Sequence, residues 1–322
     1  MAEKVAKATT ITTPGSTTAM AARSLRGSSE NRPVERIIRF LLMMCGLLSV
    51  VTTFAIVAVL IEETVRFFID VSPVDFFFGT RWAPLLQPQS FGVLPLVVGT
   101  LQIAFFAMLV AVPIGLASAI YLSMYAPERV RMVVKPLLEI LAGVPTVVYG
   151  YFALTFITPT IIRNIWGDAG VFNALSAGIA VGIMIIPMVS SLSEDAIQAV
   201  PRSLRDGALA LGATKFEVST RVMVPAALSG IMASCILALS RAVGETMIVV
   251  LAAGGTPRFE WDPLGPLQTM TAYIVQISLG DTPRGGIEYK TLFAVGFTLF
   301  LITLFMNIIS QRVTARFREE YD

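Results

Sequence analysis

Residues 93–124 read VLPLVVGTLQIAFFAMLVAVPIGLASAIYLSM, and this stretch contains no Asp, Glu, Lys or Arg. A helix needs about 20 predominantly apolar residues to cross the hydrocarbon core of a bilayer. The rest of the chain has the same character, because 55% of its 322 residues are hydrophobic and only 14% are charged. Soluble domains carry about 25% charged residues. The sequence therefore predicts an integral membrane protein.

Five other apolar stretches are long enough to cross a membrane. They are Ile37–Ile61, Val133–Ile157, Phe172–Leu192, Met223–Ala253 and Thr291–Ser310. The first is longer than the apolar region of a signal peptide and no small-residue cleavage site follows it, so it predicts a retained anchor. We expect an all-α fold of about six transmembrane helices, with bends at Pro113, Pro145 and Pro187.

These spans divide the chain into segments with different expected surroundings. The segments are a disordered cytoplasmic tail (residues 1–36), the anchor (37–61), an extracytoplasmic segment (62–92), a core (93–311) with a long loop (193–225), and a cytoplasmic C-terminus (312–322). The tail is rich in Ala, Thr, Ser and Arg and has no apolar period, which is typical of disorder. The aromatic residues of the extracytoplasmic segment are typical of a membrane interface.

The distribution of basic residues predicts the orientation of the chain, because cytoplasmic segments carry an excess of Lys and Arg. With the N-terminus inside, the segments on the cytoplasmic side hold seventeen Lys and Arg residues and those on the opposite side hold five. Both termini are therefore expected in the cytoplasm.

Missing residue types restrict the possible chemistry. The sequence contains no histidine, which removes the His-assisted nucleophiles and the usual His metal sites. None of its lysines follows a glycine, so the phosphate-binding loop G-x-x-x-x-G-K-[ST] is absent. Cys45 and Cys235 lie within apolar stretches and predict small core side chains rather than a disulfide. We expect no catalytic site, metal or cofactor on this chain, and contact with membrane lipid but not with nucleic acid.

The longest cytoplasmic loop has the pattern of two short helices. Pro201 suits the first turn of a helix that would end at Leu211, with Gly212 in the left-handed backbone conformation. Thr214 and Glu217 have the T-x-x-E spacing of a capping box, which would start the second helix. Isolated helices this short are marginal in water, so either neighbouring loops of this chain or a partner must pack against them.

The spacing in this loop resembles the E-A-A loop of ABC-importer permeases, whose pattern is E-A-A-x₃-G-x₉-I-x-L-P. The matching residues are Asp206, Gly207, Ala208, Gly212, Val222, Val224 and Pro225. The resemblance implies that the loop, including Thr214 and Glu217, forms coupling helices that sit in a groove of an ATP-hydrolysing subunit. Asp206 keeps a carboxylate at the first position, whereas Gly207 replaces an alanine and should weaken its helix by about 1 kcal/mol.

Flanking segments resemble one branch of that family, the phosphate-specific permeases of the PstC type. The segments are Phe91–Leu101, Leu116–Pro127, Leu138–Gly150 and Arg241–Met247. The resemblance implies the type I importer permease fold and a permease subunit that moves inorganic phosphate across a bacterial inner membrane. It also implies as partners a homologous second permease, a dimer of ATP-binding subunits that holds the ATP and Mg²⁺, and an extracytoplasmic phosphate-binding protein.

Three other functions stay open on the sequence. The chain could move a related oxyanion such as sulfate, molybdate or phosphonate, because a binding protein would supply most of the discrimination. It could be a secondary transporter or channel, although a structured loop without an ATP site argues for an ATPase partner. It could be a membrane-embedded enzyme, which the absence of histidine and of clustered acids disfavours.

Arg241 and Glu245 are the only charged pair deep within a predicted span. A charge at the bilayer centre costs about 2.5–3.5 kcal/mol, and a spacing of four places both residues on one helix face. In one interpretation Arg241 binds the translocated anion through its planar guanidinium, and Glu245 partly neutralises Arg241 so that the anion can leave. In the other, the pair holds helices or subunits together. Ser240 and Thr246 are candidate polar neighbours in the pathway, or bond to their own helix.

Overall fold

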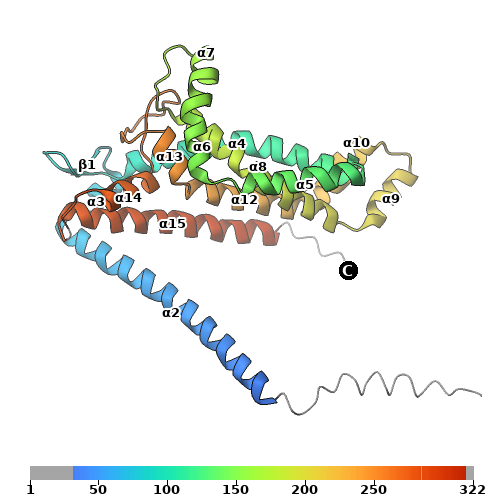
Figure 1. Ribbon diagram of the computed structural model, residues 1–322, viewed down its shortest axis with the longest axis horizontal. Coiled ribbons are helices and arrows are strands. Elements are labelled where there is room, and N and C mark those ends of the chain that lie inside the picture. Colours follow the sequence, from blue (N-terminus) through green and yellow to red (C-terminus); the bar gives the residue numbers. More distant parts are fainter. Residues whose placement is uncertain (1–31, 284, 317–322) are drawn as a thin grey trace, which may run out of the picture. The chain divides into compact units, whose positions relative to one another are not determined.

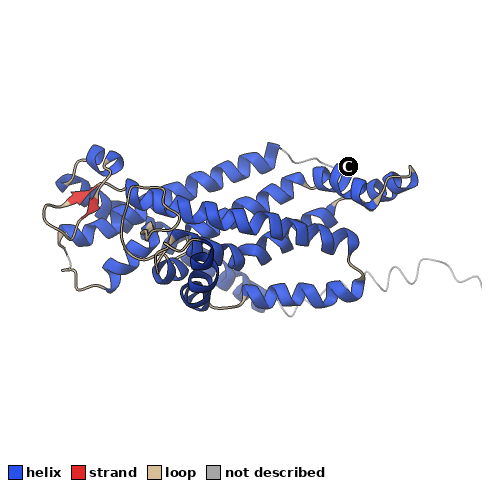
Figure 2. Ribbon diagram, turned by 90° about the horizontal axis from the view of Figure 1, so that it is seen from above, coloured by secondary structure: helices blue, strands red, loops and turns tan. Residues whose placement is uncertain are grey.

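The structure is a computed structural model that describes residues 32–283 and 285–316. The described chain is mostly helical, from α2 (Arg32–Asp70) to α15 (Ile287–Arg316), which confirms the all-α fold class (Figures 1 and 2). One short antiparallel pair, β1 (Trp82–Ala83) with β2 (Ser90–Phe91), is drawn in red in Figure 2. Most of the predicted tail and the end of the predicted C-terminus lie outside the described residues.

Within the described residues, four helices are long and apolar enough to cross a membrane, or up to six if each of two bent pairs is one span. The four are α2, α4 (Leu94–Ile120, extended by the π-helical turn η2, Tyr121–Tyr125), α8 (Ala174–Ala199) and α15. The described residues fall into two units that meet at Val59 and Leu60 within α2. The packing contacts and the candidate sites described below all lie in the second unit.

The first and last helices of the described chain are longer than the sequence predicts. Helix α2 begins at Arg32 and ends at Asp70, so the end of the predicted tail and the start of the predicted extracytoplasmic segment are helical. Helix α15 continues to Arg316, past the predicted boundary at residue 311. Charged residues end an apolar stretch of sequence, but they do not have to end the helix. Oppositely charged residues spaced by three or four positions form pairs that stabilise a helix. In α2, Arg66 lies 2.6 Å from Glu62 in such a pair.

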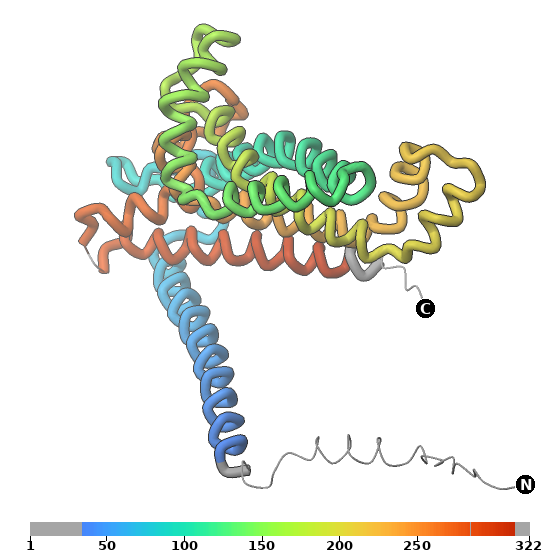
Figure 3. The backbone as a smooth tube through the Cα atoms, turned by 45° about the vertical axis from the view of Figure 1, so that its right-hand side comes forward, coloured from blue at the N-terminus to red at the C-terminus, as the bar shows by residue number. Residues whose placement is uncertain are grey.

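The predicted span Val133–Ile157 is bent at Pro145, as the sequence predicts, and its helices extend beyond the predicted bounds. It divides into α5 (Glu128–Ala142) and a second rod that comprises α6 (Thr146–Phe152), the π-helical η3 (Ala153–Ile162) and α7 (Arg163–Ile165). The two rods meet at an angle of 87°. The bend between them is seen in the green part of the tube in Figure 3. The break falls at Pro145, which has no N–H to donate and disfavours helical backbone at the residue before it. Helices α4 and α8 instead continue through Pro113 and Pro187.

The predicted span Met223–Ala253 is also interrupted. It consists of the end of η4 (Val218–Met223), α11 (Val224–Ala226), α12 (Leu228–Val243) and α13 (Met247–Ala252). The chain bends by 72° at Ala227 and leaves the helix again at Gly244. Helix α14 (Met270–Leu279) was not predicted, because its ten residues are too few to cross a membrane.

Helices α4 and α8 pack closely because glycines line their contact. A Cβ atom added at Gly178 would lie 2.5 Å from the Cβ atom of Phe106, and one added at Gly182 would lie 2.9 Å from the carbonyl oxygen of Ala107. A third glycine, Gly115 of α4, would meet Val189 of α8 at 2.8 Å. Small residues let the backbones of transmembrane helices approach, and this approach supplies the van der Waals contact that holds them together.

The replacement Gly178→Leu is therefore expected to destabilise the second unit. Overpacking of a close contact costs about 1–3 kcal/mol, so the detergent-extracted protein should show a lower unfolding midpoint and a lower yield. Gly207→Ala is the control, because an added Cβ atom there has no neighbour within 4 Å. An unchanged midpoint for Gly178→Leu, measured beside Gly207→Ala, would contradict the close contact.

Part of the expected aromatic belt is instead a protein core. Phe67, Phe76 of α3 (Pro73–Phe78) and Trp82 are buried, and Trp82 packs edge-on against Tyr273 of α14 with ring centroids 4.9 Å apart. Phe78 remains exposed, as a residue at a membrane interface would be. Composition alone does not separate the two roles, because aromatic rings are enriched in both environments.

Candidate functional site

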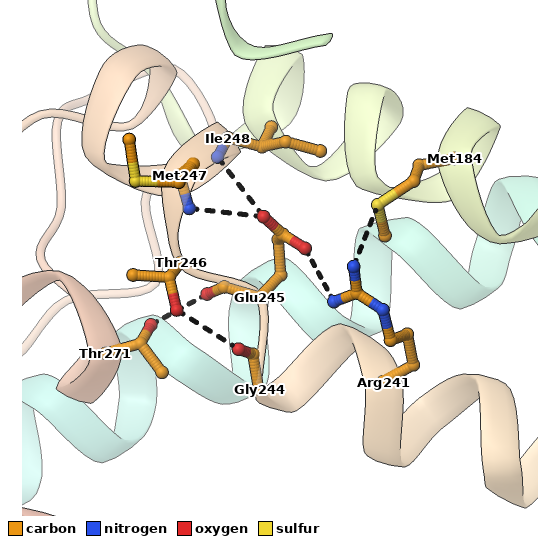
Figure 4. Close-up of polar contacts among 8 residues, drawn as sticks. All are labelled: Met184, Arg241, Gly244, Glu245, Thr246, Met247, Ile248 and Thr271. Atoms are coloured by element: carbon orange, nitrogen blue, oxygen red, sulfur yellow. Dashed lines mark hydrogen bonds and ion pairs between the residues drawn. The ribbon is translucent and has the colours of Figure 1, made fainter. Parts of the chain in front are cut away.

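Arg241 and Glu245 form an ion pair at the point where α12 ends. Arg241 lies in the last turn of α12, and Glu245 follows two residues after the helix ends at Val243. The predicted position of both residues on one helix face is therefore wrong, because the helix stops between them. Their side chains still meet, with Arg241 Nη1 2.6 Å from Glu245 Oε2 (Figure 4). A cation in the last helical turn is also favoured by the helix dipole.

The Glu245 carboxylate is the buried and fixed member of the pair. Its side chain is 2% exposed, and its Oε1 atom accepts hydrogen bonds from the backbone N–H groups of Met247 (3.2 Å) and Ile248 (3.4 Å) at the start of α13. Its backbone carbonyl accepts a hydrogen bond from the Thr271 hydroxyl at 2.7 Å. A buried carboxylate is tolerated only with such partners. Glu245 therefore keeps its place independently of Arg241.

The Arg241 side chain is 44% exposed and lines a cavity of about 460 Å³ between α5, α8 and α12. Among the described residues its only polar side-chain contacts are with Glu245 and, through Nη2 at 3.5 Å, with the sulfur of Met184. A guanidinium has five N–H donors, and a thioether is a weak acceptor. Some N–H donors of Arg241 therefore remain available to a ligand. The planar guanidinium suits a bidentate contact with an oxyanion.

Ser240 and Thr246 do not join this ion pair. The Ser240 hydroxyl donates to Asn307 Oδ1 of α15 at 3.4 Å, and the Thr246 hydroxyl donates to the carbonyl of Gly244 at 3.3 Å. Both hydroxyls are thus engaged in helix-to-helix or local contacts. Their place in a substrate pathway stays a prediction.

The first helix of the loop 193–225 is α9 (Arg202–Ala210), which begins directly after Pro201, its N-cap, and ends one residue before the predicted Leu211. Gly212 has a φ of +87°, the left-handed conformation that the sequence predicts. The N–H of Ala213 then bonds back to the carbonyl of Ala208 at 3.2 Å, which closes the helix end.

The predicted capping box is present in the second helix, α10 (Lys215–Glu217). The Thr214 hydroxyl accepts from the backbone N–H of Glu217 at 3.3 Å, and the Glu217 carboxylate accepts from the Thr214 N–H at 3.0 Å and from its hydroxyl at 2.9 Å. These hydrogen bonds hold the pKa of the Glu217 carboxyl below its usual value. The chain continues into η4, and Pro225 of α11 directly precedes the 72° bend.

The loop 193–225 has one packed face and one exposed face. Ala208, Ala213 and Val218 pack against the cluster that contains Ile197 and Met223. Outward-facing apolar residues stay exposed, Leu211 at 91% and Phe216 at 68%. Asp206 and Gly207 are also exposed. Figure 3 shows the loop in yellow as a projection at one end of the long helices. The loop is therefore held in place by its own chain and presents apolar side chains outward.

Residues 111–319 match the protein family described as "Binding-protein-dependent transport system inner membrane component". This range covers more than half of the chain and includes the loop 193–225 and the Arg241–Glu245 pair. The chain belongs to this family. As a member, it is a multi-pass membrane component of an ABC importer, and membership implies an ATPase and a substrate-binding protein as partners.

Relatives of this inner membrane component include two bacterial permeases. It is 32% identical over 296 residues to the probable ABC transporter permease protein YqgH of Bacillus subtilis, which covers 91% of this chain and 95% of that protein. It is 32% identical over 267 residues to the phosphate transport system permease protein PstC of Xylella fastidiosa, with 77% and 81% covered. Among solved structures, a bacterial ABC transporter that imports alginate matches with a TM-score of 0.60 at 20% identity, over 88% of this chain and 99% of that one. The fold is that of type I importer permeases.

A buried cluster in this inner membrane component was not predicted. The predicted span Phe172–Leu192 leaves Glu194 in a loop, but α8 continues to Ala199 and buries Glu194 completely. Two basic side chains of α5, Arg131 and Lys135, lie against it. A signal exists in the sequence, because Ile197 and Val200 continue the apolar period of α8 past Leu192.

Proposed function

We propose that this chain is the permease subunit of an ATP-driven importer of inorganic phosphate in the cytoplasmic membrane of a bacterium. The observation that carries the mechanism is the half-exposed guanidinium of Arg241 in a cavity, beside a buried carboxylate that other groups hold. The relative named as a phosphate transport permease supports phosphate as the anion. Permeases for related oxyanions are the second candidate, because a guanidinium binds sulfate and phosphate by the same geometry.

In this function Arg241 receives the anion and Glu245 sets how strongly it is held. Phosphate oxygens would accept the guanidinium donors that Glu245 and Met184 do not use. Because Glu245 stays fixed by the N–H groups of Met247 and Ile248, it keeps Arg241 oriented and partly neutralised while the anion passes. Conduction needs a site that is attractive enough to enter and weak enough to leave.

The loop 193–225, which contains α9 and α10, is the proposed coupling loop and would contact a dimer of ATP-binding subunits that bind ATP and Mg²⁺. Its exposed Leu211 and Phe216 are suited to an apolar groove on such a partner. A homologous second permease would complete the membrane pathway, and an extracytoplasmic phosphate-binding protein would deliver the anion.

The proposal is tested by uptake of labelled phosphate into vesicles that contain the complete reconstituted complex. We expect uptake to require ATP and binding protein. Excess unlabelled phosphate should suppress the uptake of labelled phosphate more strongly than excess sulfate does. Uptake that sulfate suppresses more strongly would assign the chain to another oxyanion. Uptake by this chain alone without ATP would assign it to a secondary transporter or channel.

The proposed orientation predicts which positions react with an impermeant thiol reagent. In a background with Cys45 and Cys235 replaced by serine, Leu211→Cys should be labelled only from the cytoplasmic side. Leu86→Cys, in the segment between α3 and α4, should be labelled only from outside. Both side chains are well exposed in the structure, so failure to react reports sidedness rather than burial. The opposite pattern would overturn the orientation.

A further inference from the structure

A second charged cluster lines the same cavity as Arg241. Glu194 of α8 is fully buried, and its Oε1 atom lies 2.9 Å from Arg131 Nε and accepts a hydrogen bond from Gln198 Nε2 at 2.7 Å. Its Oε2 atom lies 3.6 Å from Lys135 Nζ and has no hydrogen-bond partner in the described part of the chain. Lys135 also donates to Asp195 Oδ1 at 3.2 Å. Burying a carboxylate with one unused oxygen atom is costly, and such an atom calls for a functional reason.

The cavity runs along one face of α8 from Arg241 to this cluster. Arg241 contacts Met184, and Glu194 lies ten residues further along α8, which corresponds to about 15 Å at 1.5 Å per residue. Met188 and Ser191, spaced by helical turns between these two ends, line the same cavity. Apart from Ser191, the wall of α8 between the two charged groups is apolar. On the α5 wall of this cavity, Glu139 and Lys135 lie one helical turn apart and contribute one negative and one positive charge, and Lys135 is the one that lies against Glu194.

A second cavity, of about 310 Å³, begins on the other side of the cluster. Two partners of Glu194, Arg131 and Gln198, line it together with Arg202, Arg205 and Asp206 of the first coupling helix. The cluster therefore lies between a cavity that contains Arg241 and a polar cavity that borders the coupling loop.

We infer that Arg131, Lys135 and Glu194 form an exit site, which takes the anion from the cavity of Arg241 and releases it toward the coupling loop. This inference rests on the proposed function. Arg131 and Lys135 supply the attraction, and Glu194 competes with the anion so that it does not remain bound. Phosphate can replace Oε2 of Glu194 at Lys135 without the loss of a hydrogen bond, because Oε2 makes none in the described chain.

A simpler role for the cluster is to fasten α5 to α8. The two roles predict different results for two substitutions that break the same ion pair. If the cluster only fastens the helices, Glu194→Gln and Lys135→Gln should change the amount of retained phosphate in the same direction. If it is an exit site, removal of the acid should strengthen phosphate binding and removal of the cation should weaken it.

The experiment measures labelled phosphate that stays with the complete reconstituted complex after one turnover, beside the steady rate of uptake per assembled complex. We expect Glu194→Gln to retain more phosphate and to release it at least about tenfold more slowly, a change equivalent to about 1.4 kcal/mol. Lys135→Gln should retain less phosphate than the unmodified complex and also lower uptake. Arg129→Gln, an exposed cation of the same helix, is the matched control and should change neither quantity.

Glutamine keeps the size of Glu194 and can still accept the hydrogen bond from Gln198. Lys135 is 30% exposed, so its replacement tests the exit site even if Glu194→Gln does not assemble. Retention that changes in the same direction in both variants, or not at all in Lys135→Gln, would overturn the exit site while phosphate uptake by the unmodified complex stands. Absence of phosphate uptake by the unmodified complex would instead overturn the proposed function.

Discussion

Arg241→Gln is expected to abolish phosphate uptake while the complex still assembles. Hydrogen bonds to a charged group contribute about 1.5–3 kcal/mol each, so loss of a bidentate contact with the anion should lower uptake by about 100-fold or more. Assembly should survive, because Arg241 is half-exposed and Glu245 retains the N–H groups of Met247 and Ile248. Uptake of labelled phosphate is measured beside the yield of extracted complex, with Arg129→Gln as the control for loss of a cation.

Two companion variants separate transport from structure. Arg241→Lys should recover part of the uptake, because it keeps the charge and loses the planar fork. Glu245→Gln should slow turnover and retain phosphate, since the guanidinium loses its neutralising partner. If the pair is structural, these variants lower the yield of complex, and uptake per assembled complex stays unchanged.

A charge swap between the two positions is not a clean test of the pair. It would place a cation at residue 245, against the two backbone N–H groups that now donate to the carboxylate. Donors next to a buried cation are repulsive, so the swapped protein should be destabilised in either interpretation. The substitutions at single positions are therefore the informative ones.

Gly212→Val is expected to uncouple ATP hydrolysis from transport. Gly212 has a φ of +87°, and a β-branched residue in that conformation is strained by about 1–3 kcal/mol. The strain should displace the bond from Ala213 to Ala208 that closes α9, and with it the exposed Leu211. We expect loss of phosphate uptake together with either loss of the ATPase partner or ATPase activity that no longer depends on binding protein.

Two variants control for this change. Gly212→Asn should retain much of the coupling, because asparagine adopts the left-handed conformation more readily than other residues. Gly207→Ala adds a methyl group to the same helix in open space and should leave coupling intact. Normal uptake and normal stimulation of ATPase activity in Gly212→Val would remove the coupling role from this helix end.

The sequence by itself determined the features that depend on local chemistry. Long stretches of sequence without charged residues predict membrane helices, because each helix in lipid satisfies its backbone hydrogen bonds within its own segment. The end of α9 at Gly212 and the Thr214–Glu217 capping box were predictable because each is formed by residues within a few positions of one another. The pairing of Arg241 with Glu245 was correct for a similar reason, although the helix that was expected to carry both residues ends between them.

Tertiary structure decided the features that depend on neighbours distant in sequence. A proline in a predicted span does not by itself decide whether the helix continues: α4 and α8, which pack closely against each other, continue through Pro113 and Pro187, whereas the chain turns by 87° at Pro145. The role of Phe67 as core rather than interface required the position of the surrounding aromatic rings. Glu194 is buried because α5 brings Arg131 and Lys135 from about sixty residues away in the sequence. Burial and long-range ion pairing are properties of packed elements, and no periodicity within one segment specifies them.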